Sequence, residues 1–383
     1  MRIALVKQEI YPDLYVCGPE ERSPINILRS SIMRTGPLGL FESADCIFHI
    51  VRQSLYPECA AAFTQGNISQ ETARLLREQG SGVLPGKEWL KPGCARPQGE
   101  LAVDVESIDW STYDVVISIN ISLPSRLLQR HPRTLFCYMM SEASKRYSRW
   151  ASWGYDQCLN QNTRGRSRSW IGGPIDFPYT FLGPDTLKRL LTDHLGRASQ
   201  NTGVYAEVNM TSERPVAGPP EILRPLVESG LMVRWHKQNI IENLSEIFDA
   251  RYFVKLGGRR IRGNAIAEAI SCGTVVLADP RLLIQRELLP DSAFIEDLDS
   301  LRARIQELDQ NPGAYAEALA EQQKRLRFFG IECPLAALHT AVDRKRRLAG
   351  HAWGRMGLSL GRRIAPIRYY LDKHLGHKCA STI

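Results

Sequence analysis

The segment from Tyr252 to Pro280 constrains the fold most strongly, because it places one helix pattern between two short apolar strand patterns. Its sequence is YFVKLGGRRIRGNAIAEAISCGTVVLADP. Residues 252–256 and 274–278 predict buried strands, and residues 264–272 predict the helix that connects them. A strand, a crossover helix and a second strand in this order favour parallel strands in one sheet. We therefore expect an α/β protein.

The same alternation of strands and helices extends over most of the chain. In the first half, strands are expected at 2–6, 46–51, 114–120 and 134–138, and helices at 24–33, 70–78 and 185–195. After a polar stretch at 196–202, the pattern predicts strands at 203–209 and 231–236 and helices at 219–229 and 242–249. Beyond Pro280, we expect a helix at 282–288, a strand at 293–295 and helices at 298–308 and 312–328.

The length of the chain favours two domains. It has 383 residues, of which 43% are hydrophobic and 23% charged, a globular balance that excludes a disordered or fibrous protein. We expect a first domain at 1–196, a second at 197–340 and a basic tail at 341–383. No apolar run approaches the roughly 18 residues that would span a bilayer, and the first residues are charged too early for a signal peptide. The expected location is therefore the cytoplasm.

The cysteines and the charges exclude two further classes of protein. No two of the nine cysteines lie two to four residues apart, so we expect neither a zinc ribbon nor a disulfide framework. The formal net charge is +8, and residues 341–383 carry ten Lys and Arg against two acidic residues. The other 340 residues are therefore neutral as a whole. This distribution argues against nucleic acid as a partner, because phosphate contacts would need a basic face on the fold itself.

The loop between the first strand and the helix of the opening segment has the chemistry of a phosphate site. It contains Gly258 and Gly263, and the first turn of the following helix presents backbone N–H groups that suit an anion. Three cations lie in the same loop: Arg259, Arg260 and Arg262. Glu268 follows inside the helix, where a carboxylate can accept two hydroxyl protons from a ribose. Each feature alone also fits a tight connection or a solvated surface, and their conjunction favours a nucleotide.

The run from Glu242 to Pro280 resembles the donor-binding domain of GT-B glycosyltransferases, and is most similar to the "glycosyl transferases group 1" family. The resemblance rests on ENLSEIFDA, RYFVKL, the Gly loop and AIAEAISCGTVVLAD. It implies that Glu268 holds the donor ribose and that Gly263 and Asn264 lie at the pyrophosphate. Where the family often has a second Glu, eight positions earlier, this chain has Arg260. Arg214 matches the Arg that the family tends to place after the first strand of this domain.

The resemblance also implies a fold and an activity. The fold would be of GT-B type, with two Rossmann-like parallel-sheet domains facing a cleft. The activity would be transfer of a sugar from a nucleotide-diphosphate sugar to a carbohydrate or lipid-linked acceptor, in bacterial surface polysaccharide synthesis. No cofactor and no metal are expected, because arginines and helix N–H groups would neutralise the diphosphate and no Asp-x-Asp is found there. Two alternatives stay open: a non-catalytic GT-B-like protein that docks on an anionic membrane, and a sugar-nucleotide epimerase.

The acceptor side and the tail offer weaker candidates. Glu142, which follows a predicted strand end, is the first candidate for an acid or base, and Asp176 is the second. The tail carries an apolar stripe at helical spacing: Trp353, Met356, Leu360, Ile364, Ile367, Leu371 and Leu375. In this basic setting the stripe fits two readings equally. One is a contact with an anionic membrane at its inner face, and the other is the final helix of a GT-B protein, packed on the first domain.

Overall fold

The structure is a computed structural model, and it falls into two compact units. It describes residues 1–8, 37–40, 44–49, 100–103, 109–119, 123–139, 154–159, 171, 175–178, 180, 182–207, 224–235, 240–257, 260, 264–351, 353–354, 356–357 and 360. The first unit comprises 1–22, 41–177 and 334–383, and the second comprises 23–40 and 178–333. The units thus divide at 177/178 and 333/334, whereas the sequence analysis placed the boundaries at 196/197 and 340/341.

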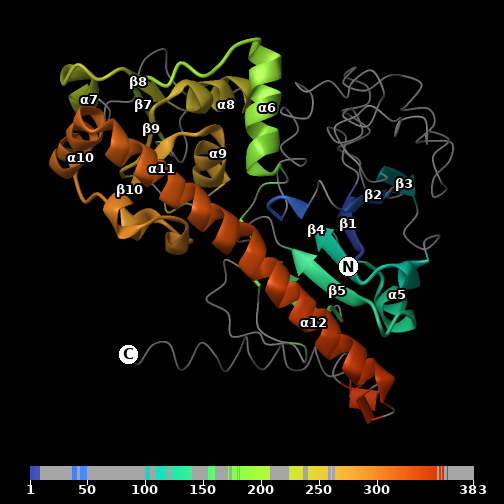
Figure 1. The fold of residues 1–383 in the computed structure, drawn as a ribbon. Coiled ribbons are helices and arrows are strands. Elements are labelled where there is room, and N and C mark those ends of the chain that lie inside the picture. The colour runs from blue at the N-terminus through green and yellow to red at the C-terminus, as the bar shows by residue number, and fades with distance from the viewer. Residues whose placement is uncertain are drawn as a thin grey trace, which may run out of the picture. The chain divides into compact units, whose positions relative to one another are not determined.

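The first unit is built on a parallel sheet whose strands lie in the order β3-β2-β1-β4-β5-β6 (Figure 1). These strands are β1 (Ile3–Gln8), β2 (Asp45–His49), β3 (Glu100–Val103), β4 (Val115–Ile119), β5 (Leu135–Met139) and β6 (Gln157–Leu159). All residues of β4 and β5 are buried, as expected for central parallel strands covered on both faces. The short helices η5 (Trp110–Thr112) and α5 (Ser125–Arg130) flank β4.

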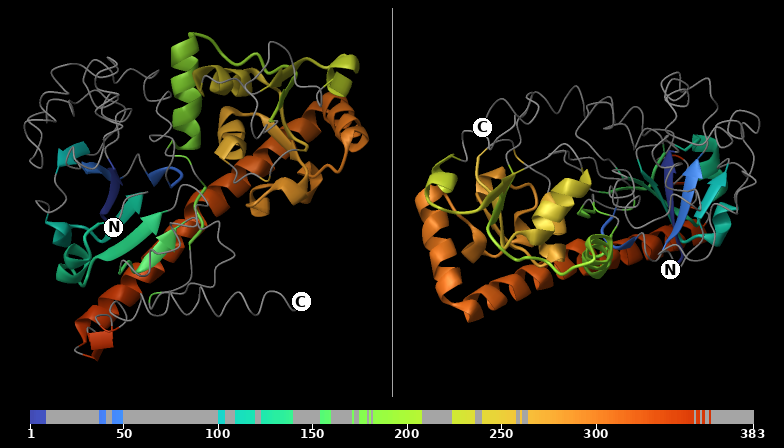
Figure 2. Two further views of the ribbon diagram at one scale, coloured as in Figure 1. Left: turned by 180° about the vertical axis from the view of Figure 1, so that it is seen from behind. Right: turned by 90° about the horizontal axis from the view of Figure 1, so that it is seen from above.

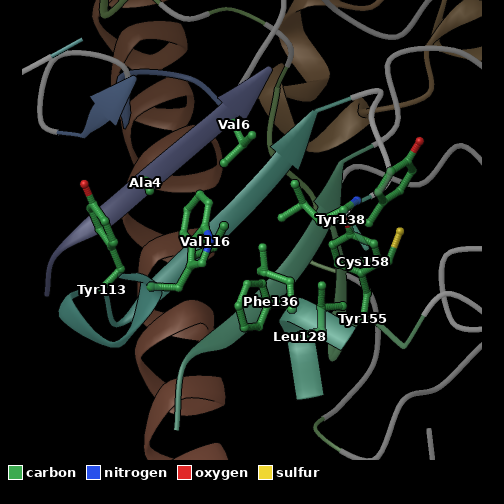
Figure 3. Close-up of a cluster of buried hydrophobic side chains, with 12 residues drawn as sticks. Ala4, Val6, Tyr113, Val116, Leu128, Phe136, Tyr138, Tyr155 and Cys158 are labelled. Atoms are coloured by element: carbon green, nitrogen blue, oxygen red, sulfur yellow. Dashed lines mark hydrogen bonds between the residues drawn. The ribbon is translucent and has the colours of Figure 1, made fainter. Parts of the chain in front are cut away.

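Aromatic side chains fill one side of this sheet (Figure 3). Tyr138 and Tyr155 meet edge to face with their ring centroids 5.2 Å apart. The Leu123 N–H donates a hydrogen bond of 2.8 Å to the hydroxyl oxygen of Tyr155, which satisfies this buried phenol. Tyr138, at the strand end that the sequence analysis singled out, is therefore a core residue.

Helix α12 (Cys333–Gly350) fastens the C-terminal part of the chain to the first unit. The Lys345 ammonium pairs with Asp156 at the start of β6, and Arg346 pairs with Asp114 before β4. Arg344 donates to the carbonyl of Ile171 at 3.2 Å. Three of the ten basic residues of the tail are thus engaged within the fold.

The second unit is built on a smaller parallel sheet in the order β10-β9-β7-β8. Its strands are β7 (Val204–Ala206), β8 (Val233–Trp235), β9 (Tyr252–Lys255) and β10 (Val275–Ala278). The helices are α6 (Pro184–Leu195), α7 (Arg224–Glu228), α8 (Ile240–Asp249), α9 (Asn264–Cys272), α10 (Leu298–Gln310) and α11 (Pro312–Arg327), followed by a π-helical turn at Phe328–Glu332. The prediction of an α/β protein with two parallel-sheet units is confirmed.

The two faces of this second sheet are covered by different helices (Figure 2). On one face, Val204, Val254 and Leu277 pack with residues of α7, α10 and α11. On the other face, Tyr205 stacks on Phe253, and its hydroxyl lies 3.5 Å from Oδ1 of Asn243 on α8. Alternation along each strand sends neighbouring side chains to opposite faces, so this division follows from the sequence order.

The structure corrects two sequence predictions after β10. The helix expected at 282–288 is replaced by two 3-10 turns, η8 (Pro280–Leu282) and η9 (Arg286–Leu288). Between them, Leu283 has extended backbone and is fully buried, and its carbonyl accepts a hydrogen bond from Arg260 in place of a helical one. The strand expected at 293–295 is a third 3-10 turn, η10 (Asp291–Ala293), followed by a single bridge from Phe294 to Ala278.

Candidate functional site

The carboxyl edge of the second sheet contains a topological switch point between β7 and β9. The chain leaves β7 for α7, which packs on one face, and leaves β9 for α9, which packs near α8 on the other. Open parallel sheets bind ligands in the crevice outside the strand ends at such a point. The residues at these two ends are Glu207, directly after β7, and Lys255, the last residue of β9.

Helix α9 starts near this edge and carries the predicted ribose ligand. It spans Asn264–Cys272, the same bounds that the sequence predicts. Its residues from Ile266 onward are buried, and the Glu268 side chain shares this burial with 7% exposure. Glu268 lies four residues after Asn264, so both side chains lie on one side of the helix, near its N-terminal end.

The charges of three carboxylates act on the buried phenol of Tyr205. Burial raises the pKa of Tyr205 well above its usual value, and the charges of Glu207, Glu268 and Glu246 raise it further. Glu268 also acts on Cys272, one turn further along α9, where burial and this carboxylate raise the thiol pKa. Glu268 is therefore a buried carboxylate within electrostatic reach of β7, beside the switch point.

Asn264 presents a buried acceptor atom at the first position of α9. Its Oδ1 atom is buried and has no hydrogen-bond partner among the described residues. Buried polar atoms nearly always have a partner, in the protein, in water or in a ligand. The side chain lies where the first backbone N–H groups of the helix lack intrahelical acceptors, so donors and an acceptor are grouped at one helix end.

Arg260 has a structural contact within the described part of the loop after β9. Its Nε–H donates a hydrogen bond of 2.9 Å to the carbonyl of Leu283, in the connection after β10. The residue is exposed, and it links the segments that follow two neighbouring strands. Gly258, Arg259, Arg262 and Gly263 lie outside the described residues, so their predicted roles stay predictions.

The remaining predicted site residues are either exposed or outside the described part of the chain. Asp176 is exposed and lies between two buried residues, Ile175 and Phe177, in the first unit. Glu142 and Arg214 lie outside the described residues. The part of the chain that the structure describes holds no group of three or more His, Cys, Asp or Glu that could bind a metal.

Glu207 and Lys255 were not among the site residues predicted from the sequence. Lys255 is fully buried, and its Nζ lies 3.4 Å from the backbone carbonyl of Glu207. A lysine is rarely buried completely. Its place at the end of an apolar strand, just before a Gly loop, was the one sequence signal that could have indicated a functional role for Lys255. That Glu207 lies across from it depends on the pairing of β7 with β9, which no local pattern encodes.

Comparisons with known proteins give matches of structure only. Neither a family model nor a curated protein sequence matches this chain. A DNA-modifying β-glucosyltransferase, studied with and without uridine diphosphoglucose, is 11% identical, with a TM-score of 0.38 over 90% of this chain and 100% of that chain. A UDP-forming α,α-trehalose-phosphate synthase from Burkholderia xenovorans is 8% identical, with a TM-score of 0.42 over 92% and 100%. A sucrose-phosphate synthase from Thermosynechococcus elongatus is 11% identical, with a TM-score of 0.38 over 91% and 100%.

The first of these structures is a glycosyltransferase by name. All three cover the chain over both units, because each match includes 90% or more of it. The identities of 8 to 11% and the TM-scores of 0.38 to 0.42 are low. Similarity at this level carries nothing about substrate or mechanism.

Proposed function

We propose that this chain is a glycosyltransferase that moves a sugar from a nucleotide-diphosphate sugar to a carbohydrate or lipid-linked acceptor. The observation that supports this most is the buried carboxylate of Glu268, one turn inside the helix that begins after the Gly loop at the switch point. A carboxylate there can accept both hydroxyl protons of a ribose, while the helix N-terminus and the loop arginines face the diphosphate.

These residues would contribute to catalysis by electrostatic stabilisation. Glycosyl transfer leaves negative charge on the departing nucleoside diphosphate, and fixed N–H groups and guanidinium groups stabilise that charge without reorganising. Holding donor and acceptor together contributes the rest, by removing the entropy cost of their encounter. This scheme assigns binding to Glu268, Asn264 and the loop arginines, and keeps Glu142 and Asp176 as candidates for the acid or base.

Binding of nucleoside diphosphates tests this function first. We expect one of ADP, CDP, GDP and UDP to raise the melting temperature, since a ligand at 100 times its Kd adds about 2.7 kcal/mol of stability. Glu268→Gln should weaken that binding, because a hydrogen bond to a charged group contributes about 1.5–3 kcal/mol. Glu242→Gln is the matched control, since Glu242 is exposed on α8. If no nucleoside diphosphate binds, or if both variants bind like the native chain, the proposal is wrong.

Turnover separates the proposed enzyme from its alternatives. A glycosyltransferase releases the nucleoside diphosphate only when an acceptor is present, apart from slow hydrolysis. An epimerase converts the sugar nucleotide without releasing a diphosphate, and a binding protein leaves it unchanged. Chromatography of a bound sugar nucleotide, incubated with and without a lipid-linked or oligosaccharide acceptor, distinguishes these three results.

We further propose that the segment after α12 contacts an anionic membrane, at its inner face, where a lipid-linked acceptor for bacterial surface polysaccharide would lie. Beyond Gly350 the chain carries six basic residues and one acidic residue, a net charge of +5. Trp353, Met356 and Leu360 follow at steps of three and four residues and are 80%, 54% and 53% exposed. Exposed apolar side chains among basic residues are typical of interfacial segments. In the described part of the chain, no helix is long and apolar enough to cross a bilayer.

Truncation after Gly350 tests this contact, because it leaves the Lys345 and Arg346 ion pairs in place. We expect the truncated chain to unfold like the full chain but to lose sedimentation with vesicles of phosphatidylglycerol and phosphatidylcholine. Changing Trp353, Met356 and Leu360 together to Ser should have the same effect. Binding by the full chain should weaken as salt rises, because part of it is electrostatic. A full chain that does not sediment with these vesicles at low salt would contradict the proposal.

A further inference from the structure

Lys255 is a fully buried cation at the candidate site, at the carboxyl edge of the second sheet. It ends β9, one of the two strands that flank the switch point, and the Gly loop begins two residues later. Its Nζ donates to the backbone carbonyl of Glu207, 3.4 Å away, at the end of the neighbouring strand β7. An ammonium is costly to bury, so its position calls for compensating negative charge nearby.

Strand geometry puts this ammonium on the face of the sheet that carries Tyr205 and Phe253. Lys255 follows Phe253 by two residues, so both side chains point to one face of the sheet. Phe253 stacks on Tyr205 with ring centroids 5.5 Å apart. The charges of Glu207 and Glu268 help to raise the pKa of the Tyr205 phenol. Lys255 and Glu268 are both buried in this unit, on a strand and a helix that follow one another, and charges interact more strongly in a buried environment than in water.

The other ionisable groups near Glu268 come from several elements. On α9 itself lies Cys272, and α6 brings Lys188, whose charge acts on that thiol. From β7 come Tyr205 and Glu207, and from α8 comes Glu246, which is ion-paired with Arg234 at 3.0 Å. Helix α11, which also packs against α9, carries the Glu321–Arg325 ion pair. Among these groups, Lys255 is the fully buried cation.

We propose that Lys255 is a positioning residue for the donor, whose buried ammonium keeps the carboxylate of Glu268 ionised and fixed beside the ribose. This inference rests on the proposed function, because it deepens the role of Glu268. Without the Lys255 ammonium, burial would favour the protonated form of Glu268. A protonated carboxyl donates through one of its oxygens and so accepts the two ribose hydroxyls less well.

The pH dependence of nucleotide binding tests this role. The probe is UDP, or whichever of ADP, CDP and GDP binds the native chain. The terminal phosphate of the probe also titrates in this range, so each variant is compared with the native chain at the same pH. We expect the affinity of Lys255→Met, relative to the native affinity, to fall by about tenfold between pH 8 and pH 5.5. The sign follows from the loss of the ionised carboxylate as the pH drops through a raised pKa of Glu268. Glu268→Gln should bind weakly at both pH values, and adding Lys255→Met to it should bring no new pH dependence.

Two further variants control for a merely structural effect. Lys255→Arg keeps the charge and should keep the native pH profile. Lys324→Met removes an exposed ammonium of the same unit, on α11, and should also leave the pH profile of nucleotide binding native. A Lys255→Met variant whose affinity is native, or is reduced by one factor at every pH, overturns the proposal. A native chain that binds none of the four probes overturns the proposed function instead.

A direct titration of the native chain keeps the proposal testable if Lys255→Met does not fold. Glutamate labelled with ¹³C at the side-chain carboxyl gives one resonance per residue, and the resonance missing from Glu268→Gln identifies Glu268. We expect this carboxylate to remain ionised down to pH 5 in the native chain. A Glu268 that is protonated at pH 7 overturns the proposal.

Discussion

The ammonium of Lys345 on α12 lies 2.5 Å from Oδ1 of Asp156, and both side chains are buried. The second carboxylate oxygen, Oδ2, accepts a hydrogen bond of 2.9 Å from the Phe136 N–H at the start of β5. One carboxylate therefore connects α12 to the central part of the first sheet. The pair joins residues 189 positions apart in the chain.

Removing one partner of this ion pair should destabilise the first unit strongly. In Lys345→Met the Asp156 carboxylate stays buried without its counter-ion, which costs about 3–5 kcal/mol. Lys324→Met is the control, because Lys324 is exposed and its nitrogen lies 3.8 Å from Glu321, a surface pair that contributes at most about 1 kcal/mol. Urea unfolding measures both. Equal losses in the two variants would contradict the role given to the buried pair.

The link between α6 and α8 in the second unit should depend on pH. Arg197 binds both carboxylate oxygens of Asp249, at 2.7 and 2.6 Å. Burial acts to raise the pKa of Asp249, but the hydrogen bonds from Arg197 and Gln200 and the charges of Arg197 and Arg234 lower it overall. The folded pKa is thus below the unfolded value of about 3.9.

We therefore expect Asp249→Asn to lose stability at pH 7 but to approach the native chain in acid. The contribution of Asp249 is complete above the unfolded pKa and disappears as the pH falls through the folded pKa. The free energy of unfolding, measured for both chains between pH 7 and pH 3, gives this difference. Asp299→Asn, at an exposed position of α10, should show no such convergence. A difference that persists unchanged at the lowest pH would contradict the assignment.

The elements that the sequence predicts best are those with local and complete patterns. Helix α9 has the predicted bounds, and β4 lies within the predicted strand, because every residue from Val115 to Ile119 is apolar or small and buried. The strand Gln157–Leu159 was missed, since three residues that begin with a polar side chain give no periodicity. The prediction of a helix at 282–288 was wrong: Leu283 is extended there and its carbonyl bonds to Arg260, 23 positions away, a contact that no local pattern shows.

The candidate site was predictable only where its residues follow one another in the chain. Glu268 and Asn264 belong to one helix after one loop, so spacing alone places them together. Glu207 and Lys255 are 48 positions apart and meet because β7 pairs with β9 and not only with β8. That strand order is a property of the packed sheet. For the same reason, no local pattern relates Lys345 to Asp156.

Arg260 should affect binding of the diphosphate more than binding of the nucleoside. Its Nε–H donates a hydrogen bond to the carbonyl of Leu283, and its guanidinium charge belongs to the predicted phosphate loop. We expect Arg260→Ala to weaken UDP binding by about 1.5–3 kcal/mol and to change uridine binding little. Arg281→Ala is the control, since Arg281 pairs with Asp279 and is 75% exposed. Calorimetry that finds equal losses for UDP and uridine would leave Arg260 with its structural contact alone.

The described cysteines should differ sharply in reactivity. Burial, followed by the charges of Asp156 and Cys158, raises the pKa of Cys137, and burial and Glu268 raise that of Cys272. A raised pKa leaves little thiolate at pH 8, and burial excludes the reagent. Cys333 is exposed. Among these three cysteines, iodoacetamide should therefore modify Cys333 first and should reach Cys137 and Cys272 only in urea, as peptide mass spectrometry can measure.

The stability of the edge strand β10 should depend on one amide side chain, that of Gln322. Gln322 of α11 is buried; its Oε1 accepts from the Val276 N–H and its Nε2 donates to the Val276 carbonyl, both at 2.9 Å. The side chain thus replaces a neighbouring strand along β10, which lies at the end of the sheet order. Gln322→Ala leaves two buried backbone groups without partners, so we expect a loss of about 1–3 kcal/mol for each. Gln323→Ala, at the adjacent exposed position, should cost little, and thermal unfolding that ranks the two variants equally would contradict this role.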